Sequence, residues 1–266
     1  MEKDDLLFYN EYEQFYLMAG NSMAFKHFCG KAFGEDFSQD GFSDVSQVDR
    51  IIPYIPKDKK AHILDIGCGN GKLLGYLQKK TGAYIYGFDY SNNAIKTAKE
   101  LFRKDSEFTQ GCIGEVDYPE DKFDVIISMD TMYFAPDMSA FVDQIMKWLK
   151  KGGVFFTCYQ EGDVMPKTAD ENTSVLSMIL KDKKIDYDCI DITKESYDIL
   201  LRKREAALSL KEEFVKEGNS GWFEMLVAQT DYADKPFEEY KKEMARYIYT
   251  VLNLQKRGNK KGNALF

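Results

Sequence analysis

The sequence is poor in the side chains that usually carry metal or disulfide chemistry. Its 266 residues include two histidines and five cysteines, and no two cysteines stand in a C-x-x-C spacing. An odd number of widely separated cysteines argues against a disulfide framework. No histidine, aspartate and glutamate cluster has the spacing of a metal site. We therefore expect neither a structural disulfide nor a bound metal.

Long apolar runs and an excess of positive charge are also missing. No apolar stretch approaches the roughly 18 residues of a membrane-spanning helix, and the acidic start 1–5 leads into no signal-like segment. The formal net charge is −8, whereas nucleic-acid binding needs a basic patch. These absences predict a cytoplasmic protein that binds neither membrane nor nucleic acid and takes a small neutral or cationic molecule.

The sequence does contain a repeated alternation of short apolar runs with amphipathic segments. Strands are expected at 61–66, 83–89, 107–111, 123–129, 154–159, 185–192 and 246–254. Helices are expected at 44–52, 72–80, 94–103, 138–150, 172–181 and 194–216. Repeated strand–helix units predict an α/β fold whose mostly parallel sheet is covered by helices on both faces.

Four segments are expected around this alternation. Residues 1–50 carry aromatic side chains at helical spacing and predict an N-terminal helical lid. Residues 51–193 hold the core strands. The charged stretch 194–245 predicts a helical cap inserted before the last strand, and 246–266 supplies that strand and a polar tail.

The clearest functional motif is the stretch D-I-G-C-G-N-G at 65–71. It follows an apolar strand and precedes a helix, so a ligand can lie against bare backbone with helix N–H groups aimed at it. A dinucleotide fingerprint would need a third glycine where Lys72 stands, and no Walker sequence occurs. The spacing therefore favours a nucleotide-like ligand other than a dinucleotide.

Two later elements support a nucleotide site. Asp89 ends the second expected strand, where a carboxylate can accept hydrogen bonds from both ribose hydroxyls. The loop 111–115 follows the third strand, and its backbone can flank a purine. Taken alone, Asp89 could instead precede a helix as a cap, which is the less favoured interpretation, and the loop could be an ordinary connection.

These motifs resemble those of small-molecule class I S-adenosylmethionine-dependent methyltransferases. The resemblance covers about residues 45–160 and rests on 64–71, Asp89, 123–128 and 149–153. It implies a Rossmann-like fold with a seven-stranded sheet. It also implies S-adenosyl-L-methionine as cofactor and methyl transfer to a small molecule.

The resemblance also assigns cofactor-binding residues. It implies that Asp65 lies near the methionine amino group, that the cofactor passes over Gly67 and Gly69, and that Asp89 binds the ribose. The segment 30–42 would close over the methionine end. The predicted cofactor-binding residues are Gln39, Asp65, Gly67, Cys68, Gly69, Gly71, Asp89, Tyr90, Gly114, Glu115 and Met129.

Residues for the methyl acceptor are expected at the carboxyl ends of the fourth and fifth strands, where open α/β sheets place ligands. Asp130 and Tyr133 are predicted to be catalytic, because a carboxylate or phenol can take or relay a proton from an attacking amine. Aromatic faces can hold a cationic amine, which favours N-methylation. The predicted substrate-binding residues are Tyr12, Tyr16, Tyr133, Tyr159 and Trp222.

Several alternatives stay open at this point. The acceptor atom could be oxygen, sulfur or carbon, and the chain could bind the cofactor without transferring a methyl group. An NAD-dependent oxidoreductase is disfavoured by the glycine spacing, and a macromolecular acceptor by the charge. His62, at the start of the first strand, and His27, in the aromatic N-terminal region, are expected to be structural. The oligomeric state is not predicted.

Overall fold

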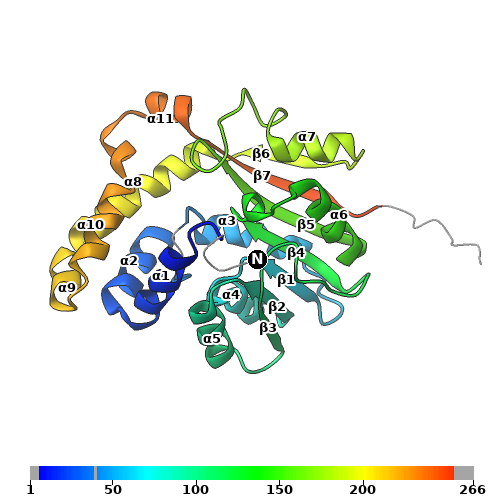
Figure 1. Cartoon of the computed structure of the whole chain (residues 1–266), viewed down its shortest axis with the longest axis horizontal. Helices are drawn as coiled ribbons and strands as arrows, with labels where there is room; N and C mark the ends of the chain where they lie inside the picture. The colour runs from blue at the N-terminus through cyan, green and yellow to red at the C-terminus, as the bar shows by residue number, and fades with distance from the viewer. Residues whose placement is uncertain (1–5, 39–40, 255–266) are drawn as a thin grey trace, which may run out of the picture.

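The computed structural model describes residues 6–38 and 41–254. Seven strands form one sheet in the order β3-β2-β1-β4-β5-β7-β6 (Figure 1). Their bounds are β1 His62–Ile66, β2 Tyr84–Asp89, β3 Ser106–Gln110, β4 Phe123–Met129, β5 Leu149–Glu161, β6 Asp188–Asp191 and β7 Ala245–Leu252. Strands β1 to β5 are parallel, and β7 runs antiparallel between β5 and β6. The predicted Rossmann-like, mostly parallel sheet is confirmed.

Side chains of the central strands alternate between two helical layers. Ile63 of β1 packs with the helices α3 (Val45–Asp49), α4 (Lys72–Thr81) and α5 (Asn92–Leu101). Leu64 and Ile66 face the opposite side, with α6 (Met138–Trp148) and α7 (Val175–Asp182). Because both faces are covered, β1 reads as a nearly continuous apolar run.

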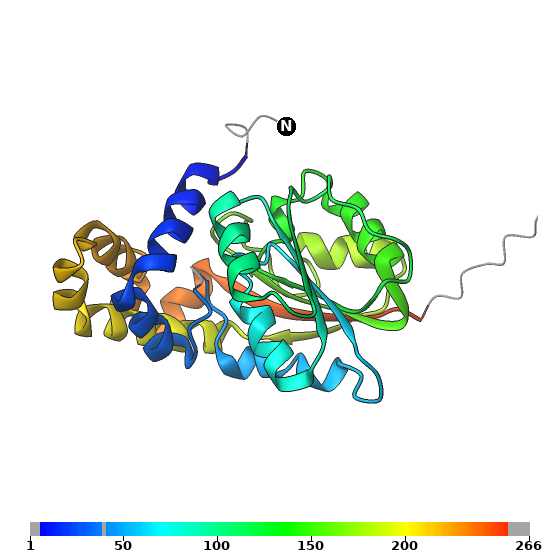
Figure 2. The ribbon, with the colours of Figure 1, turned by 90° about the horizontal axis from the view of Figure 1, so that it is seen from below.

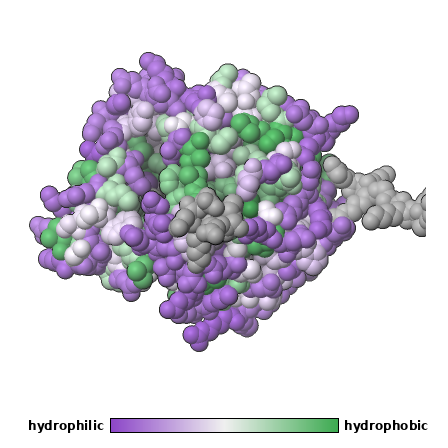
Figure 3. All heavy atoms as spheres, viewed as in Figure 1, coloured by the Kyte–Doolittle hydropathy of each residue, from purple (hydrophilic) through white to green (hydrophobic). Residues whose placement is uncertain are grey.

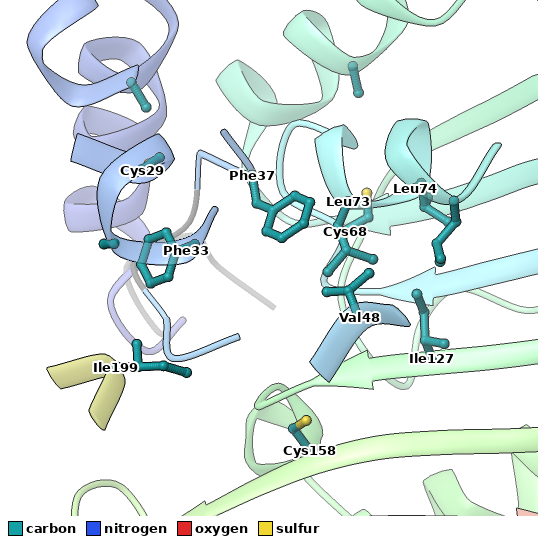
Figure 4. Packing of buried hydrophobic residues seen from close by; sticks show 14 of the residues in the cluster. Cys29, Phe33, Phe37, Val48, Cys68, Leu73, Leu74, Ile127, Cys158 and Ile199 are labelled. Atoms are coloured by element: carbon teal, nitrogen blue, oxygen red, sulfur yellow. The ribbon is translucent and has the colours of Figure 1, made fainter. Parts of the chain in front are cut away.

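The remaining helices gather at one end of the molecule (Figures 1 and 2). Their bounds are α1 Tyr9–Asn21, α2 Met23–Phe33, α8 Thr193–Ser209, α9 Lys211–Lys216, α10 Ser220–Ala228 and α11 Phe237–Glu243. Short 3-10 turns lie at η2 Ile52–Tyr54, η3 Met132–Phe134 and η4 Asp231–Asp234. One apolar cluster continues from the sheet into these helices, since Phe33 and Ile199 belong to it together with Ile127 (Figure 4).

These six helices form the helical lobe. Glu217, directly after α9, connects α1 and α2 with the four later helices of the lobe. One of its carboxylate oxygens, Oε1, accepts hydrogen bonds from the backbone N–H groups of Met23 and Ala24, both at 2.9 Å. The other oxygen accepts from the hydroxyl of Ser22 at 2.5 Å. A carboxylate therefore occupies the N-terminus of α2, where the unpaired N–H groups favour negative charge. The predicted roles of 1–50 as lid and 194–245 as cap stay predictions.

The observed elements differ from the expected ones mainly at their ends. Strand β5 runs over Leu149–Glu161 rather than 154–159, because it lies between two strands and pairs with β7 up to Glu161. The helix expected at 194–216 is divided near Leu210 into α8 and α9. Within the described ranges 6–38 and 41–254, no helix has the length and apolar character of a membrane span.

Ser91 provides a test of how the segment before α5 is held. Its hydroxyl accepts from the Ala94 N–H at 3.1 Å and donates to Glu13 Oε1 at 2.5 Å. We expect Ser91→Ala to lower the free energy of unfolding by about 1 kcal/mol, because the N-cap is lost. Urea denaturation measures this, with Ser139→Ala on exposed α6 surface as the control. Equal, negligible effects would contradict the capping role.

Candidate functional site

A cavity of about 1080 Å³ opens at the carboxyl ends of the central strands. Its floor is the glycine loop after β1 with the ends of β2 and β4, and α1, α8 and α10 form its walls. Apolar residues gather near the centre of this face, between the lobe and the sheet (Figure 3). Small-molecule sites usually have about 300–1,000 Å³, so the cavity is large enough for a nucleotide-like ligand with a second small molecule.

The glycine loop needs glycine for conformation and for space. Gly67, Gly69 and Gly71 have φ of 69°, 53° and 75°, values that side-chain-bearing residues adopt only at a cost. A Cβ on Gly67 would lie 2.7 Å from Thr131 Cγ2, and one on Gly69 would lie 2.3 Å from Tyr16 Oη. The first two glycines line the cavity, whereas Gly71 does not.

Two buried carboxylates lie beside the loop. Asp89 accepts hydrogen bonds from Gly69 N–H at 2.9 Å and Ser91 N–H at 2.8 Å. Burial raises its pKa to about 6 despite these two bonds. Burial and the charge of Asp89 raise the pKa of Asp65 well above its usual range. Asp65 Oδ1 is buried and has no hydrogen-bond partner among the described residues. This corner of the cavity is therefore suited to a cation or a hydrogen-bond donor.

Helix α1 covers this corner. The rings of Tyr12 and Tyr16 stack with centroids 6.2 Å apart, and both line the cavity. Glu13 fastens the helix to the sheet side by accepting from Ser91 Oγ at 2.5 Å and Asn93 N–H at 3.2 Å. Tyr90, next to Asp89, donates to the Leu7 carbonyl at 3.0 Å. The tyrosines of α1 and Tyr90, directly after β2, thus line this corner of the cavity.

Asp130 also lines the cavity, but its carboxylate is not free. It directly follows β4, and its carboxylate binds Arg246 through Nε–Oδ1 and Nε–Oδ2 contacts of 3.1 and 3.0 Å and an Nη2–Oδ2 contact of 2.6 Å. The guanidinium thus already occupies both oxygens of the carboxylate. The geometry therefore argues against the predicted role of Asp130 in taking a proton.

Tyr133 of η3 lines the same part of the cavity. Burial, and then the charge of Asp130, raises its pKa well above the usual range. The phenol is therefore protonated at neutral pH and can donate a hydrogen bond, but it is a poor proton acceptor. Trp222 of α10 lies on the opposite wall, toward the lobe.

The structure brings most predicted site residues together. Those that line the cavity are Tyr12, Tyr16, Asp65, Gly67, Cys68, Gly69, Asp89, Tyr90, Met129, Asp130, Tyr133 and Trp222. Gln39 lies outside the described residues. The binding roles of all of these stay predictions.

Four predicted residues do not line the cavity. Tyr159 packs against Tyr249 in the cluster under α6 and α7, because side chains alternate along β5 and the neighbouring Gln160 faces the cavity instead. Gly114 and Glu115 are exposed, since the chain turns away from the cavity after Ile113. Gly71 begins α4 beneath the ring of Phe108. The geometry of the cavity does not support direct contacts of these four residues with a ligand, and their binding roles stay predictions.

Two charged residues of the site were missed. Lys203 of α8 is 2% exposed, lines the cavity and places Nζ 4.4 Å from the centroid of the Phe42 ring. Arg246 of β7 is 1% exposed. Both lie in charged or strand-like stretches of ordinary appearance, so no local signal separates them from solvent-facing residues.

The histidines lie away from the cavity. His27 of α2 is exposed and pairs with Glu213 at 2.7 Å. His62 begins β1 at the end of the strand away from the cavity, where its ring contacts those of Tyr84 and Tyr86 at centroid distances of 5.7 and 5.6 Å. Burial lowers its pKa. Among the residues that the structure describes, no three histidine, cysteine or acidic side chains are grouped to hold a metal ion.

The fold and the glycine loop define a class I S-adenosylmethionine-dependent methyltransferase architecture, and the comparisons with known proteins agree. The model of the family described as "Methyltransferase domain" matches residues 57–214, so the chain belongs to this family. Phosphoethanolamine N-methyltransferase 3 of Arabidopsis thaliana is 28% identical over 224 residues, which are 82% of this chain and 42% of that protein. A sterol 24-C-methyltransferase of Gibberella zeae is 30% identical over 135 residues, 48% of this chain and 34% of that protein.

Solved structures show the same fold. Phosphoethanolamine N-methyltransferase 2 of Haemonchus contortus, in complex with S-adenosyl-L-methionine, has a TM-score of 0.75 at 19% identity, covering 96% of this chain and 62% of that one. The cyclopropane synthase MmaA2 of Mycobacterium tuberculosis has a TM-score of 0.67 at 15% identity, covering 91% and 98%. The chain spans half or less of the length of the two curated relatives.

Gly67 and Gly82 form a matched pair that tests the space above the loop. Their φ values are 69° and 72°, but a Cβ on Gly82 would have no atom within 4 Å, whereas one on Gly67 would meet Thr131. We expect Gly82→Ala to cost about 1 kcal/mol of unfolding free energy from backbone strain alone, and Gly67→Ala to cost clearly more. Chemical denaturation compares them. Equal costs would mean that Thr131 moves aside freely.

Proposed function

We propose that this protein is an S-adenosylmethionine-dependent methyltransferase that methylates the nitrogen of a small amine. The observation that carries the proposal is the single cavity that joins the glycine loop and two buried carboxylates to an aromatic wall. The glycine loop and the two carboxylates are suited to bind S-adenosylmethionine as the methyl donor. The aromatic wall is suited to hold a neutral or cationic methyl acceptor. The N-methyltransferase relatives favour nitrogen as the acceptor atom.

The residues present fit the proposed cofactor. Gly67 and Gly69 leave bare backbone at the cavity floor. The unpaired Asp65 Oδ1 is placed to accept from an ammonium group. Asp89 uses one hydrogen bond on each oxygen, and a carboxylate has about four acceptor positions. It would therefore still accept from ribose hydroxyls. When bound, S-adenosylmethionine supplies an electrophilic methyl group on its sulfonium.

The chain's own residues would then orient and desolvate the acceptor. An amine must be neutral to attack, and burial among Tyr12, Tyr133 and Trp222 favours the neutral form. The paired Asp130 and the protonated Tyr133 can orient the amine through hydrogen bonds rather than take its proton. Alignment and exclusion of water are the main contributions expected of a methyltransferase site.

The lobe side suggests an acceptor with an apolar part. Leu200, Trp222 and Met225 line the cavity from α8 and α10, so carbon groups beyond the nucleophile would be buried there. Transfer to oxygen, sulfur or carbon stays an alternative, and a sterol C-methyltransferase is among the relatives. A cofactor-binding module without transfer activity is a further alternative. Cytoplasmic location stays a prediction.

Methyl-labelled S-adenosylmethionine distinguishes these possibilities. We expect the protein to transfer label to members of an amine panel and not to matched phenols or thiols. Label only in phenols or thiols would support the oxygen or sulfur alternative. Binding of S-adenosylhomocysteine without any transfer would support the non-catalytic module, and absence of binding would overturn the proposal.

Asp89 tests the cofactor site. We expect Asp89→Ala to raise the Kd of S-adenosylhomocysteine about tenfold or more, because hydrogen bonds to a charged group are worth about 1.5–3 kcal/mol. Isothermal titration calorimetry measures the affinity. Asp143→Ala, which removes an exposed carboxylate on α6, is the control and should bind like the parent protein. Unchanged affinity in Asp89→Ala would refute the ribose assignment.

Tyr133 tests the acceptor site. Tyr133→Phe removes only the hydroxyl, so we expect turnover with the amine found in the labelling panel to fall several-fold while the Kd of S-adenosylhomocysteine stays within about twofold. Trp222→Phe, which keeps an aromatic wall, provides a comparison. If Tyr133→Phe changed cofactor affinity as much as turnover, the hydroxyl would belong to the cofactor site instead.

A further inference from the structure

Arg246 is a buried cation in which each N–H donor is used. Nε donates to the Asp130 carboxylate at 3.0–3.1 Å. Nη2 donates to Asp130 at 2.6 Å and to Ser43 Oγ at 2.7 Å. Nη1 donates to the Phe42 carbonyl at 2.6 Å and to Gln47 Oε1 at 2.9 Å. A guanidinium has five N–H groups in a planar fork, and this environment occupies them all.

These partners come from separate parts of the chain. Asp130 follows β4, whereas Phe42, Ser43 and Gln47 belong to the segment 41–47, which includes the first residues of α3. The backbone N–H of Arg246 also bonds to Thr193 Oγ1 at 3.1 Å, at the start of α8. The sheet, the segment 41–47 and the beginning of the helical lobe therefore meet at one side chain.

Asp130 needs an external partner to hold its orientation. Its φ is 58°, a left-handed conformation that is uncommon for a non-glycine residue. Its N–H is fixed to the Cys158 carbonyl at 3.0 Å, and its carboxylate is bound on both oxygens by Arg246. Phe42 and Gly41, on the other side of Arg246, line the same cavity as Asp130.

We propose that Arg246 is a positioning residue that couples the position of the segment 41–47 to the orientation of Asp130 in the proposed acceptor part of the cavity. The inference rests on the proposed function for its consequence, since the coupled residues border the acceptor. The coupling itself is a property of the protein without ligands. Removing the contacts of Arg246 with Asp130 therefore loosens the segment 41–47, and removing its contacts with that segment loosens Asp130.

Three titratable groups around the ion pair of Asp130 and Arg246 carry no charge at neutral pH. Burial raises the pKa of Cys158 of β5 and of Tyr240 of α11 to about 12. Burial also raises the pKa of Tyr133 of η3 well above its usual range. These three are therefore neutral at neutral pH. A purely structural ion pair would stabilise the fold without linking these segments, and this is the alternative to be tested.

The two ends of β4 provide a matched comparison. Asp124, near the start of the strand, is 5% exposed and pairs with Lys150 at 2.7 Å. Asp124→Asn and Asp130→Asn each remove the charge of a paired carboxylate, one near the start of β4 and one directly after its end. We expect only Asp130→Asn to accelerate amide hydrogen exchange of residues 42–48, by at least tenfold, because Arg246 links Asp130 to this segment. The measurement uses the unliganded full chain.

Two further variants separate positioning from stability. Arg246→Lys keeps the positive charge but not the planar fork of N–H donors. We expect amide exchange at 42–48 to be faster in this variant than in the parent protein, even where the two melting temperatures are similar. Gln47→Met removes a partner of Arg246 outside the ion pair. We expect it to raise the KM for the amine at least fivefold with little change in the Kd of S-adenosylhomocysteine.

The coupling is overturned if Asp130→Asn leaves exchange at 42–48 unchanged, or accelerates it no more than Asp124→Asn does. Full protection at 42–48 in Arg246→Lys would also overturn it, because a point charge would then suffice. If S-adenosylhomocysteine does not bind, the proposed function fails, yet the exchange comparison still tests the coupling.

Discussion

The site depends on how the chain leaves the central strand β1. The strand order reverses between β1 and β4, and such a reversal opens a crevice at the carboxyl ends of the strands. The loop after β1 is held in this crevice because the N–H groups of Gly67 and Cys68 both donate to the Phe88 carbonyl at 3.0 Å. Thr131 donates to the Ile66 carbonyl at 2.7 Å from the β4 side. The loop is therefore fixed by both neighbours of β1.

The three carboxylates that line the cavity, those of Asp65, Asp89 and Asp130, differ in how they are paired. At the cofactor end, Asp65 and Asp89 are close enough for the charge of one to raise the pKa of the other. A cation bound there would relieve this repulsion. Asp130, which lines the same cavity, already has a cationic partner in Arg246. Asp130 is thus paired within the protein, whereas Asp65 Oδ1 has no hydrogen-bond partner among the described residues.

Much of the fold followed from the sequence, since buried parallel strands and capped helices have local signals. β4 was predicted at its observed bounds, Phe123–Met129. The glycine loop and Asp89 were also placed correctly, because a turn without side chains and an acid at a strand end are local features. Tyr159 was misplaced by a single residue along β5, since the carboxyl end of the strand could be predicted but not the face of each side chain.

The sequence by itself determined the class of fold and identified the glycine loop, Asp65 and Asp89, which the structure brings to one cavity. These depend on short-range patterns: apolar runs, alternating glycines and caps. Only the tertiary structure decided the acceptor end, where Arg246 meets Asp130 across 116 positions and Phe42 across 204. Contacts at such separations are set by strand order and helix packing, which no local pattern encodes.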